Sequence, residues 1–175
     1  MNLTTRAFAG FVLIASAIVL GTALLSEYWG GLAPCELCLV QRWPWAAAIT
    51  ISFIVLLVGE HARLDWVALV LAIVFAISVV LAFYHVGVEQ HWFAGPTACT
   101  APPGGAMTLE QMKQQILGTA PVLCDRPAWT LFGVSLAGWN LLASLIMTGC
   151  CIAAWLHARG FRRSQPRRDV RRGTA

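Results

Sequence analysis

Four cysteines stand at positions and spacings that favour thiol–disulfide exchange. Cys35 and Cys38 form a CxxC motif, and Cys99 and Cys124 follow 25 residues apart. Two thiols at the start of a helix can close a small ring, and both the helix N-terminus and a nearby cation lower the pKa of a thiol. Arg42 offers such a cation, one helical turn after Cys38. The motif therefore predicts an accessible redox pair with an arginine beside it.

The same residues also have structural interpretations. A CxxC can bind zinc, but a zinc site usually needs a second close pair or histidines, and Cys99 and Cys124 are far apart in the sequence. Cys99 and Cys124 alone are equally consistent with a permanent disulfide that closes a loop, a constraint of about 3 to 4 kcal/mol in the chain-entropy model. Without the CxxC, Arg42 would suit a lipid headgroup anchor. The CxxC favours redox chemistry, and both interpretations of the second pair stay open.

Four long apolar segments have to position these cysteines. The 175 residues are 58% apolar and 11% charged, whereas soluble chains carry about 25% charged residues. A bilayer core needs about 20 apolar residues per helix, and the uncharged runs predict spans near residues 7–26, 42–60, 66–85 and 128–156. The expected fold class is an all-α membrane protein, with a four-transmembrane-helix bundle as its single domain over residues 1–158.

Composition excludes several classes of function. Four spans leave no room for a large soluble domain, and neither a Walker loop nor a GxGxxG turn is present, so we do not expect nucleotide-driven transport by this chain alone. The net charge of +4 does not indicate nucleic acid, because seven of the twelve basic residues are arginines between 159 and 172. Residues 159–175 are therefore predicted to be a basic, disordered cytoplasmic tail.

The basic residues also predict the orientation of the spans. Nine of them flank one side and three flank the other, which by the positive-inside rule makes both termini cytoplasmic. Loops near residues 27–41 and 86–127 then face outward, where disulfides persist. These two loops carry the CxxC, Cys99 and Cys124.

Two further features of the sequence have simpler interpretations. A capping-box pattern predicts a short amphipathic helix from Thr108 within the long outer loop, suited to lie on the membrane surface. Cys150 and Cys151 fall in the inner half of the fourth span, on the reducing side of the membrane. We interpret them as small apolar packing residues.

A set of motifs in a fixed order extends from the first span to the fourth. It comprises Pro34-Cys35-Glu36-Leu37-Cys38, Gln41-Arg42, Tyr84-His85, Gly95-Pro96-Thr97-Ala98-Cys99, Cys124-Asp125, Trp129, Phe132-Gly133 and Gly138-Trp139-Asn140. This set resembles the disulfide bond formation protein B family, DsbB. The basic tail and the Cys150-Cys151 pair lie outside the resemblance.

The resemblance implies a quinone-coupled thiol oxidase of the bacterial inner membrane. Such an enzyme reoxidises a soluble, DsbA-like thioredoxin-fold partner in the periplasm and passes the electrons to ubiquinone or menaquinone in the bilayer. Carried over to this sequence, Cys99 receives the partner's thiol as a mixed disulfide and Cys124 is its bonded mate. Cys35 and Cys38 pass the electrons on, with Cys38 as the thiolate beside the quinone ring and Arg42 as a residue that supports quinone binding.

The neighbouring polar residues and the alternative functions complete the sequence-based hypotheses. His85, at the outer end of the third span, is a second candidate for quinone binding, as a donor to a carbonyl oxygen, whereas Glu89 and His91 receive no role. The alternatives are a structural or binding membrane protein with two stapling disulfides and a thiol/quinone reductase similar to the vitamin K epoxide reductase group. Within the family, an oxidase dedicated to one special client also stays open.

Overall fold

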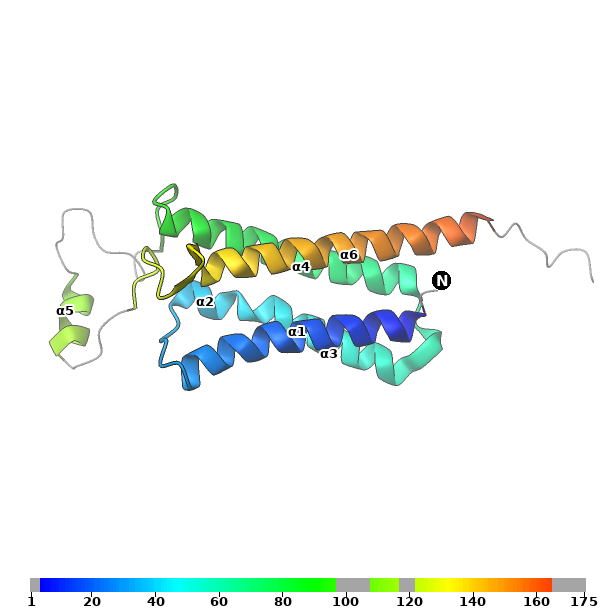
Figure 1. Ribbon diagram of the computed structural model, residues 1–175, viewed down its shortest axis with the longest axis horizontal. Helices are drawn as coiled ribbons and strands as arrows, with labels where there is room; N and C mark the ends of the chain where they lie inside the picture. The colour runs from blue at the N-terminus through cyan, green and yellow to red at the C-terminus, as the bar shows by residue number, and fades with distance from the viewer. Residues whose placement is uncertain (1–3, 97–107, 117–121, 165–175) are drawn as a thin grey trace, which may run out of the picture.

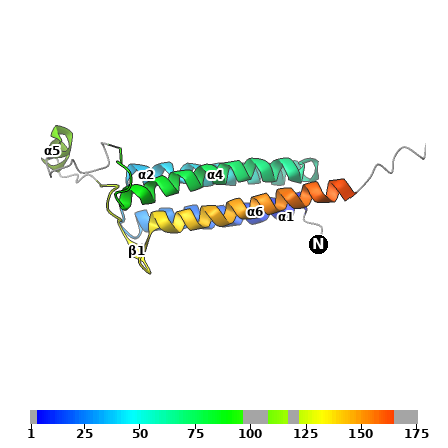
Figure 2. The ribbon, with the colours of Figure 1, turned by 90° about the horizontal axis from the view of Figure 1, so that it is seen from above.

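Four long helices lie side by side in the structure, a computed structural model that describes residues 4–96, 108–116 and 122–164. Within these residues four helical segments are long and apolar enough to cross a membrane, Thr5–Tyr28, Glu36–Val58, Leu64–Glu89 and Leu136–Gly160. The helices are α1 (Thr5–Tyr28), α3 (Arg42–Val58), α4 (Leu64–Glu89) and α6 (Leu136–Ser164) (Figures 1 and 2). The expected fold class, an all-α membrane protein built on four spans, is confirmed.

The bundle consists of two helix pairs. α1 packs on α3 and α4 packs on α6, and contacts between α3 and α4 join the two pairs. The interface is built from small and apolar side chains, together with an edge-to-face contact between Trp45 and Phe75 whose ring centroids are 5.2 Å apart. Ser78 of α4 and Ser144 of α6 also share a buried hydrogen bond of 2.8 Å. Because lipid tails compete for apolar surface, such close packing and interhelical hydrogen bonding hold the helices together.

One end of the bundle carries the CxxC, and we call it the CxxC end. Here the short helix α2 (Glu36–Val40) precedes α3, whereas the start of α1 and the last turns of α6 lie at the opposite end (Figure 1). Gln41 separates α2 from α3. Pro44 lies in the first turn of α3, where its missing N–H removes no helical hydrogen bond. The CxxC therefore occupies its own turn before the main span.

The fourth span, helix α6, begins later than the sequence indicated. Instead of helix from residue 128, the structure has a hairpin of β1 (Thr130–Leu131) and β2 (Val134–Ser135). The turn residues Phe132 and Gly133 have φ values of 53° and 77°, the left-handed conformation that a two-residue hairpin turn requires. The helix then runs to Ser164, past the predicted start of the tail at residue 159, and residues 165–175 lie outside the described part of the chain.

The third span, helix α4, is one turn longer than expected. It extends to Glu89 instead of ending near residue 85, and His91 with a φ of 58° follows its C-terminal end. The extra turn places His85 and Glu89 in one helix, four residues apart, so that their side chains lie on the same face. The outer loop accordingly starts about four residues later than predicted, and it contains the expected short helix as α5 (Leu109–Ile116) beyond the CxxC end.

Candidate redox site

The two thiols of the CxxC lie in direct contact. The sulfurs of Cys35 and Cys38 lie 3.0 Å apart and share a hydrogen bond, and the Cys38 backbone N–H donates to Cys35 Sγ at 3.3 Å. Cys35 is the N-cap of α2 and is only 5% exposed. The hydrogen bond from the Cys38 thiol, with contributions from His85 and the Cys38 backbone, holds the pKa of Cys35 well below that of an ordinary thiol, although burial opposes it. In the reduced pair the negative charge is thus favoured on Cys35.

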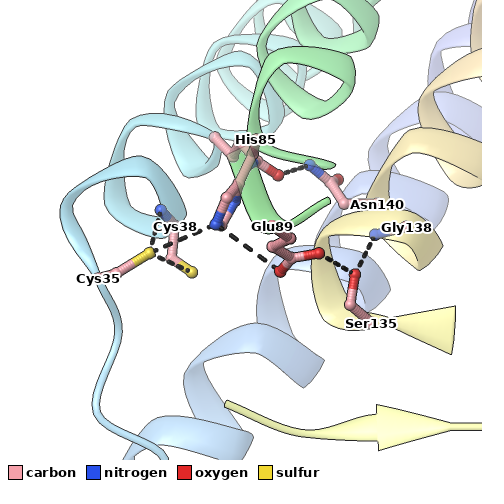
Figure 3. Close-up of polar contacts among 8 residues, drawn as sticks. Cys35, Cys38, His85, Glu89, Ser135, Gly138 and Asn140 are labelled. Carbon is pink, nitrogen blue, oxygen red and sulfur yellow. Dashed lines mark hydrogen bonds and ion pairs between the residues drawn. The ribbon is translucent and has the colours of Figure 1, made fainter. Parts of the chain in front are cut away.

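His85 reaches this pair from α4. Its side chain is buried, and its Nε2 lies 3.6 Å from Cys35 Sγ (Figure 3). The sequence placed His85 at the end of its span, and the structure brings it against the CxxC, 50 residues away along the chain.

A chain of hydrogen bonds across three helices orients His85. The Trp45 Nε1–H donates to Asn140 Oδ1 at 2.8 Å, the Asn140 amide donates to Gln41 Oε1, and the Gln41 amide donates to His85 Nδ1 at 2.6 Å. The direction of every step follows from the first, because an indole N–H can only donate. Nδ1 of His85 is therefore an acceptor, and Nε2 carries the hydrogen that faces Cys35.

This tautomer bears on the zinc alternative. Cys35, Cys38 and His85 place three ligand-type atoms within 4.8 Å of one another, which are donor types that zinc accepts. A histidine that binds metal through Nε2 needs a free lone pair there and usually donates its other N–H to an acceptor. Here Nδ1 accepts from Gln41. The hydrogen-bond network therefore favours a hydrogen-bonded thiolate over a metal ligand set, and we do not assign these residues as metal ligands.

A buried carboxyl group lies on the other side of His85. Glu89 Oε1 is 3.8 Å from His85 Nε2, and both side chains are nearly inaccessible. The Ser135 hydroxyl donates to Glu89 Oε2 and itself accepts from the Gly138 N–H at the start of α6 (Figure 3). The hairpin before α6 thus supplies the polar partner of Glu89.

The long outer loop returns to the CxxC at Cys124. Cys124 is 1% exposed and belongs to one buried cluster with Cys35 and Val88, against which Cys38 and Tyr84 pack. Cys99, its predicted mate, falls among residues 97–107, outside the described part of the chain. The structure thus brings together three of the four predicted cysteines.

Arg42 lines the same site but contacts another residue. Its Nη1 donates to Glu27 Oε2 at the end of α1, and both side chains are about one-fifth exposed. Arg42 also lines a cavity of about 570 Å³, together with Cys38 and His85. Arg42 and Cys38 therefore line one cavity, but the contact that the structure gives Arg42 is with the Glu27 carboxylate and not with Cys38.

The cavity has the size and the lining of a site for an apolar ring compound. Ligand pockets typically measure about 300 to 1,000 Å³ and combine apolar walls with a few polar groups. Trp45, Trp129 and Trp139 contribute aromatic walls, and the polar groups come from the CxxC end.

The remaining pair, Cys150 and Cys151, lies in α6, with Cys151 fully buried in the apolar core.

Sequence reasoning gave no role to four polar residues of this site. They are Glu27, Gln41, Glu89 and Asn140. An amide or a carboxyl group inside or at the edge of a span is costly unless it has a partner, and that cost was the signal available in the sequence. The partners could not be read from the sequence because each contact joins residues that are 15 to 99 positions apart along the chain.

Comparisons with known proteins identify relatives of this chain. A family model described as disulfide bond formation protein DsbB matches residues 5–154. The chain is 29% identical to Disulfide bond formation protein B of Stutzerimonas stutzeri, covering 79% of this chain and 87% of that protein. It is 26% identical to the protein of the same name in Acinetobacter baumannii, covering 87% and 91%, and 27% identical to the uncharacterized protein RP370 of Rickettsia prowazekii, covering 75% and 77%. No solved structure is a significant match.

Proposed function

Because this chain belongs to the disulfide bond formation protein DsbB family, we propose that it is a quinone-coupled oxidase for a thioredoxin-fold partner. Membership makes it a multi-pass membrane protein of disulfide bond formation and a disulfide oxidoreductase. The proposal adds the route of the electrons, the acceptor and the partner. In it, electrons enter at the outer loop, cross the CxxC and leave at the cavity.

The observation that carries the proposal is the position of the CxxC between Cys124 and the cavity. Cys35 packs against Cys124 in one buried cluster, whereas Cys38 lines the cavity. A thiolate on Cys124 can attack Cys35 of an oxidised CxxC, which forms a Cys35–Cys124 disulfide and releases Cys38 as a thiolate. The charge then lies on the sulfur that borders the cavity, although Cys35 holds it in the reduced pair.

The partner's electrons enter through Cys99 in this scheme. Its assignment rests on the resemblance, since Cys99 lies outside the described residues. A thiol of the partner attacks the Cys99–Cys124 disulfide, bonds to Cys99 and frees Cys124, and the partner's second thiol then releases the partner as a disulfide. A soluble, DsbA-like protein with a thioredoxin fold has the accessible low-pKa thiol that this exchange requires.

The cavity fits a membrane quinone, either ubiquinone or menaquinone. A quinone supplies a lipid-soluble acceptor for two electrons and two protons. Tryptophan side chains would hold the ring, and Arg42 and His85 offer cationic and neutral N–H donors to developing negative charge on oxygen. Glu27 keeps the guanidinium of Arg42 in place at the cavity wall.

The proposed location is the bacterial inner membrane, with the CxxC end facing the periplasm. Four spans bring the start of α1 and the end of α6 to the same end of the bundle, opposite the CxxC (Figure 1). With nine basic residues on that side, the positive-inside rule makes it cytoplasmic. Labelling intact cells with a membrane-impermeant maleimide after reduction should modify outer cysteines. Labelling only after the membrane is opened would reverse the orientation.

The decisive experiment mixes the purified full chain with ubiquinone or menaquinone and a reduced thioredoxin-fold substrate. Quinol should form in proportion to the substrate disulfide, and omission of the protein should stop it. Mixed instead with the oxidised partner, a Cys124→Ser variant should form a mixed disulfide, because the Cys99 thiolate attacks the partner's disulfide and releases the partner's second thiol, whereas Cys99→Ser should form none. Equal trapping by both variants, or the absence of quinol in the wild type, would refute the electron route.

The structural alternative is distinguished by the same assay. If both cysteine pairs were permanent staples, no mixed disulfide would form and no quinol would accumulate. A reductase similar to the vitamin K epoxide reductase group would run the reaction in the opposite direction, with quinol or another reductant as donor. The contact between Cys35 and Cys124 favours exchange over stapling, because it places the two cysteine pairs within one cluster.

A further inference from the structure

Trp45 is a buried tryptophan whose polar atom can play only one part in a hydrogen bond. Its side chain is 2% exposed, and its Nε1–H donates to Asn140 Oδ1 of α6 at 2.8 Å. The next members of the network are the amides of Asn140 and Gln41 and the ring of His85, and each of them holds one group that donates and one that accepts. An indole cannot accept, so Trp45 gives the whole network its direction.

The last member of the network, His85, faces two acceptors on its other side. Gln41 donates to Nδ1 at 2.6 Å, which leaves the ring hydrogen on Nε2. Nε2 lies 3.6 Å from Cys35 Sγ and 3.8 Å from Glu89 Oε1 (Figure 3). The same N–H is thus presented to a sulfur and to a carboxyl oxygen. This arrangement matches a thiolate on Cys35, which is an acceptor without a hydrogen of its own.

A proton on Cys35 conflicts with the direction of the network. A thiol hydrogen directed at His85 would meet the hydrogen on Nε2. It would fit only if the ring hydrogen stood on Nδ1 and both amides were turned, so that Gln41 accepted from His85 and donated to Asn140 Oδ1. The Asn140 amide N–H would then face the indole N–H of Trp45. Two hydrogens would oppose each other at one end or the other, so the network disfavours the neutral thiol.

We propose that Trp45 is a positioning residue that holds His85 in the tautomer with its hydrogen on Nε2 and thereby keeps Cys35 in the thiolate form. It acts through the amides of Asn140 and Gln41, over three hydrogen bonds. Thiol–disulfide exchange requires a thiolate. The use of this thiolate in electron transfer rests on the proposed function, whereas the tautomer and the thiolate themselves need neither quinone nor partner.

Other titratable groups surround Cys35 in α2, α4 and the outer loop. Cys38 shares a hydrogen bond with it, Glu89 lies beside His85, and Cys124 packs against it. The hydrogen bond with Cys38 is the largest cause of the lowered pKa of Cys35, and His85 adds to it. Substitution of Trp45 should therefore weaken the thiolate without abolishing it.

The first test observes the tautomer of His85 directly. The full chain is labelled with nitrogen-15 at its four histidines, reduced and studied by NMR in detergent, and the His85 signals are identified by their loss in His85→Ala. In the wild type the hydrogen should be on Nε2. Trp45→Phe should give a mixture of the two tautomers, because the amides can then turn. Trp155→Phe, at a tryptophan of α6 outside the network, should match the wild type.

Two NMR results would overturn the proposal. One is a hydrogen on Nδ1 of His85 in the wild type, and the other is an unchanged tautomer in Trp45→Phe. If Trp45→Phe does not fold, Gln41→Met carries the same test, since it removes the donor to Nδ1 and should also release the tautomer.

The second test measures the consequence at Cys35. Its alkylation is followed by mass spectrometry from neutral pH down to the pH at which the rate has fallen by half. In Trp45→Phe this midpoint should rise by about 0.3 to 1 pH unit, which is a two- to tenfold tighter binding of the proton and corresponds to the loss of at most one hydrogen bond. In a His85→Ala background, Trp45→Phe should produce no further shift, because the path to Cys35 is already interrupted.

The double variant separates positioning from a general effect on structure. If the shifts of Trp45→Phe and His85→Ala add up, Trp45 does not act through His85 and the proposal is refuted. Both tests are independent of the electron route. If the wild type forms no quinol but both tests succeed, the proposed function fails and the role of Trp45 stands. If quinol forms but either test fails, the electron route stands and the positioning role is wrong.

Discussion

Two regions of the bundle each hold a pair of cysteines, the CxxC end and the middle of α6, and the pairs differ in what surrounds them. Cys35 and Cys151 are both buried, at 5% and 0% exposure. Cys35 shares a hydrogen bond with the Cys38 thiol, accepts one from the Cys38 backbone and faces His85, whereas Cys151 lies among apolar side chains of the core. Both regions bury their cysteines, and the hydrogen-bonding groups around Cys35 are what make its pair suited to exchange.

The largest predicted effect comes from the cysteines themselves. Cys35→Ser or Cys38→Ser should lower quinol formation by on the order of a thousandfold or more, since each removes an electron carrier. Cys150→Ser combined with Cys151→Ala should leave the rate within about twofold, because these thiols pack in the core. The measurement is steady-state quinol formation with a reduced thioredoxin-fold substrate. Equal losses of quinol formation in the two sets of variants would contradict the predicted functional difference between the pairs.

A second prediction concerns the pH dependence of alkylation. The lowered pKa means that Cys35 stays a thiolate as the pH falls, so its alkylation rate should change little between pH 8 and 6. An ordinary thiol with a pKa near 8.5 loses about tenfold per pH unit in this range. Mass spectrometry of the modified peptides at each pH measures the profile.

Substitution of His85 sharpens the same comparison. His85→Ala removes one of the contributions that lower the pKa of Cys35, so the pKa should rise and alkylation should weaken at the acidic end. His157→Ala, at the opposite end, should leave the profile unchanged. If the pH profile of alkylation were unaltered in His85→Ala, the contacts with Cys38 alone would account for the lowered pKa of Cys35.

A third prediction tests the cationic wall of the cavity. Arg42→Ala should raise the KM for quinone by about tenfold, the effect of losing one charged hydrogen bond of about 1.5 kcal/mol. Arg42→Lys should be milder, because it keeps the charge but loses the planar fork. Glu27→Gln should raise KM less than Arg42→Ala, since it removes only the partner that positions the guanidinium. Unchanged KM in all three variants would make Arg42 a headgroup anchor.

The smallest predicted effects are on stability. Asn140→Leu strands the Trp45 N–H and Gln41 Oε1 and should destabilise the bundle by about 1 to 2 kcal/mol, near the upper end for polar contacts between membrane helices. Ser144→Ala removes the Ser78 contact and should cost about 0.6 kcal/mol. Unfolding of the purified protein in mixed detergent gives both values. If Ser144→Ala destabilised the bundle more than Asn140→Leu, the Asn140 network would orient His85 without stabilising the fold.

The hairpin and the longer third helix show why sequence patterns misplace boundaries at the CxxC end. An uncharged run shows only that a segment is compatible with the bilayer. Residues 128–135 were therefore predicted to belong to a span, although Phe132 and Gly133 form a turn. The predicted third span ends at His85, directly after the uncharged run to Tyr84, and so stops four residues short of Glu89. In the structure Glu89 stays helical since His85 and Ser135 surround it. Polar contacts between side chains thus determine where these helices begin and end, and hydropathy alone does not predict those positions.

The sequence by itself predicted the four spans and the family resemblance, which the helices and the family model bear out, and it singled out Cys35 and Cys38 as a redox pair, which stays a prediction. These features depend on local composition and on short spacing, which a chain carries before it folds. Only the tertiary structure brought Gln41, at the junction of α2 and α3, together with His85 of α4 and Asn140 of α6 in one directed hydrogen-bond network. The physical reason is that hydrogen-bond partners inside a bundle are chosen by helix packing, which spacing along the chain does not encode.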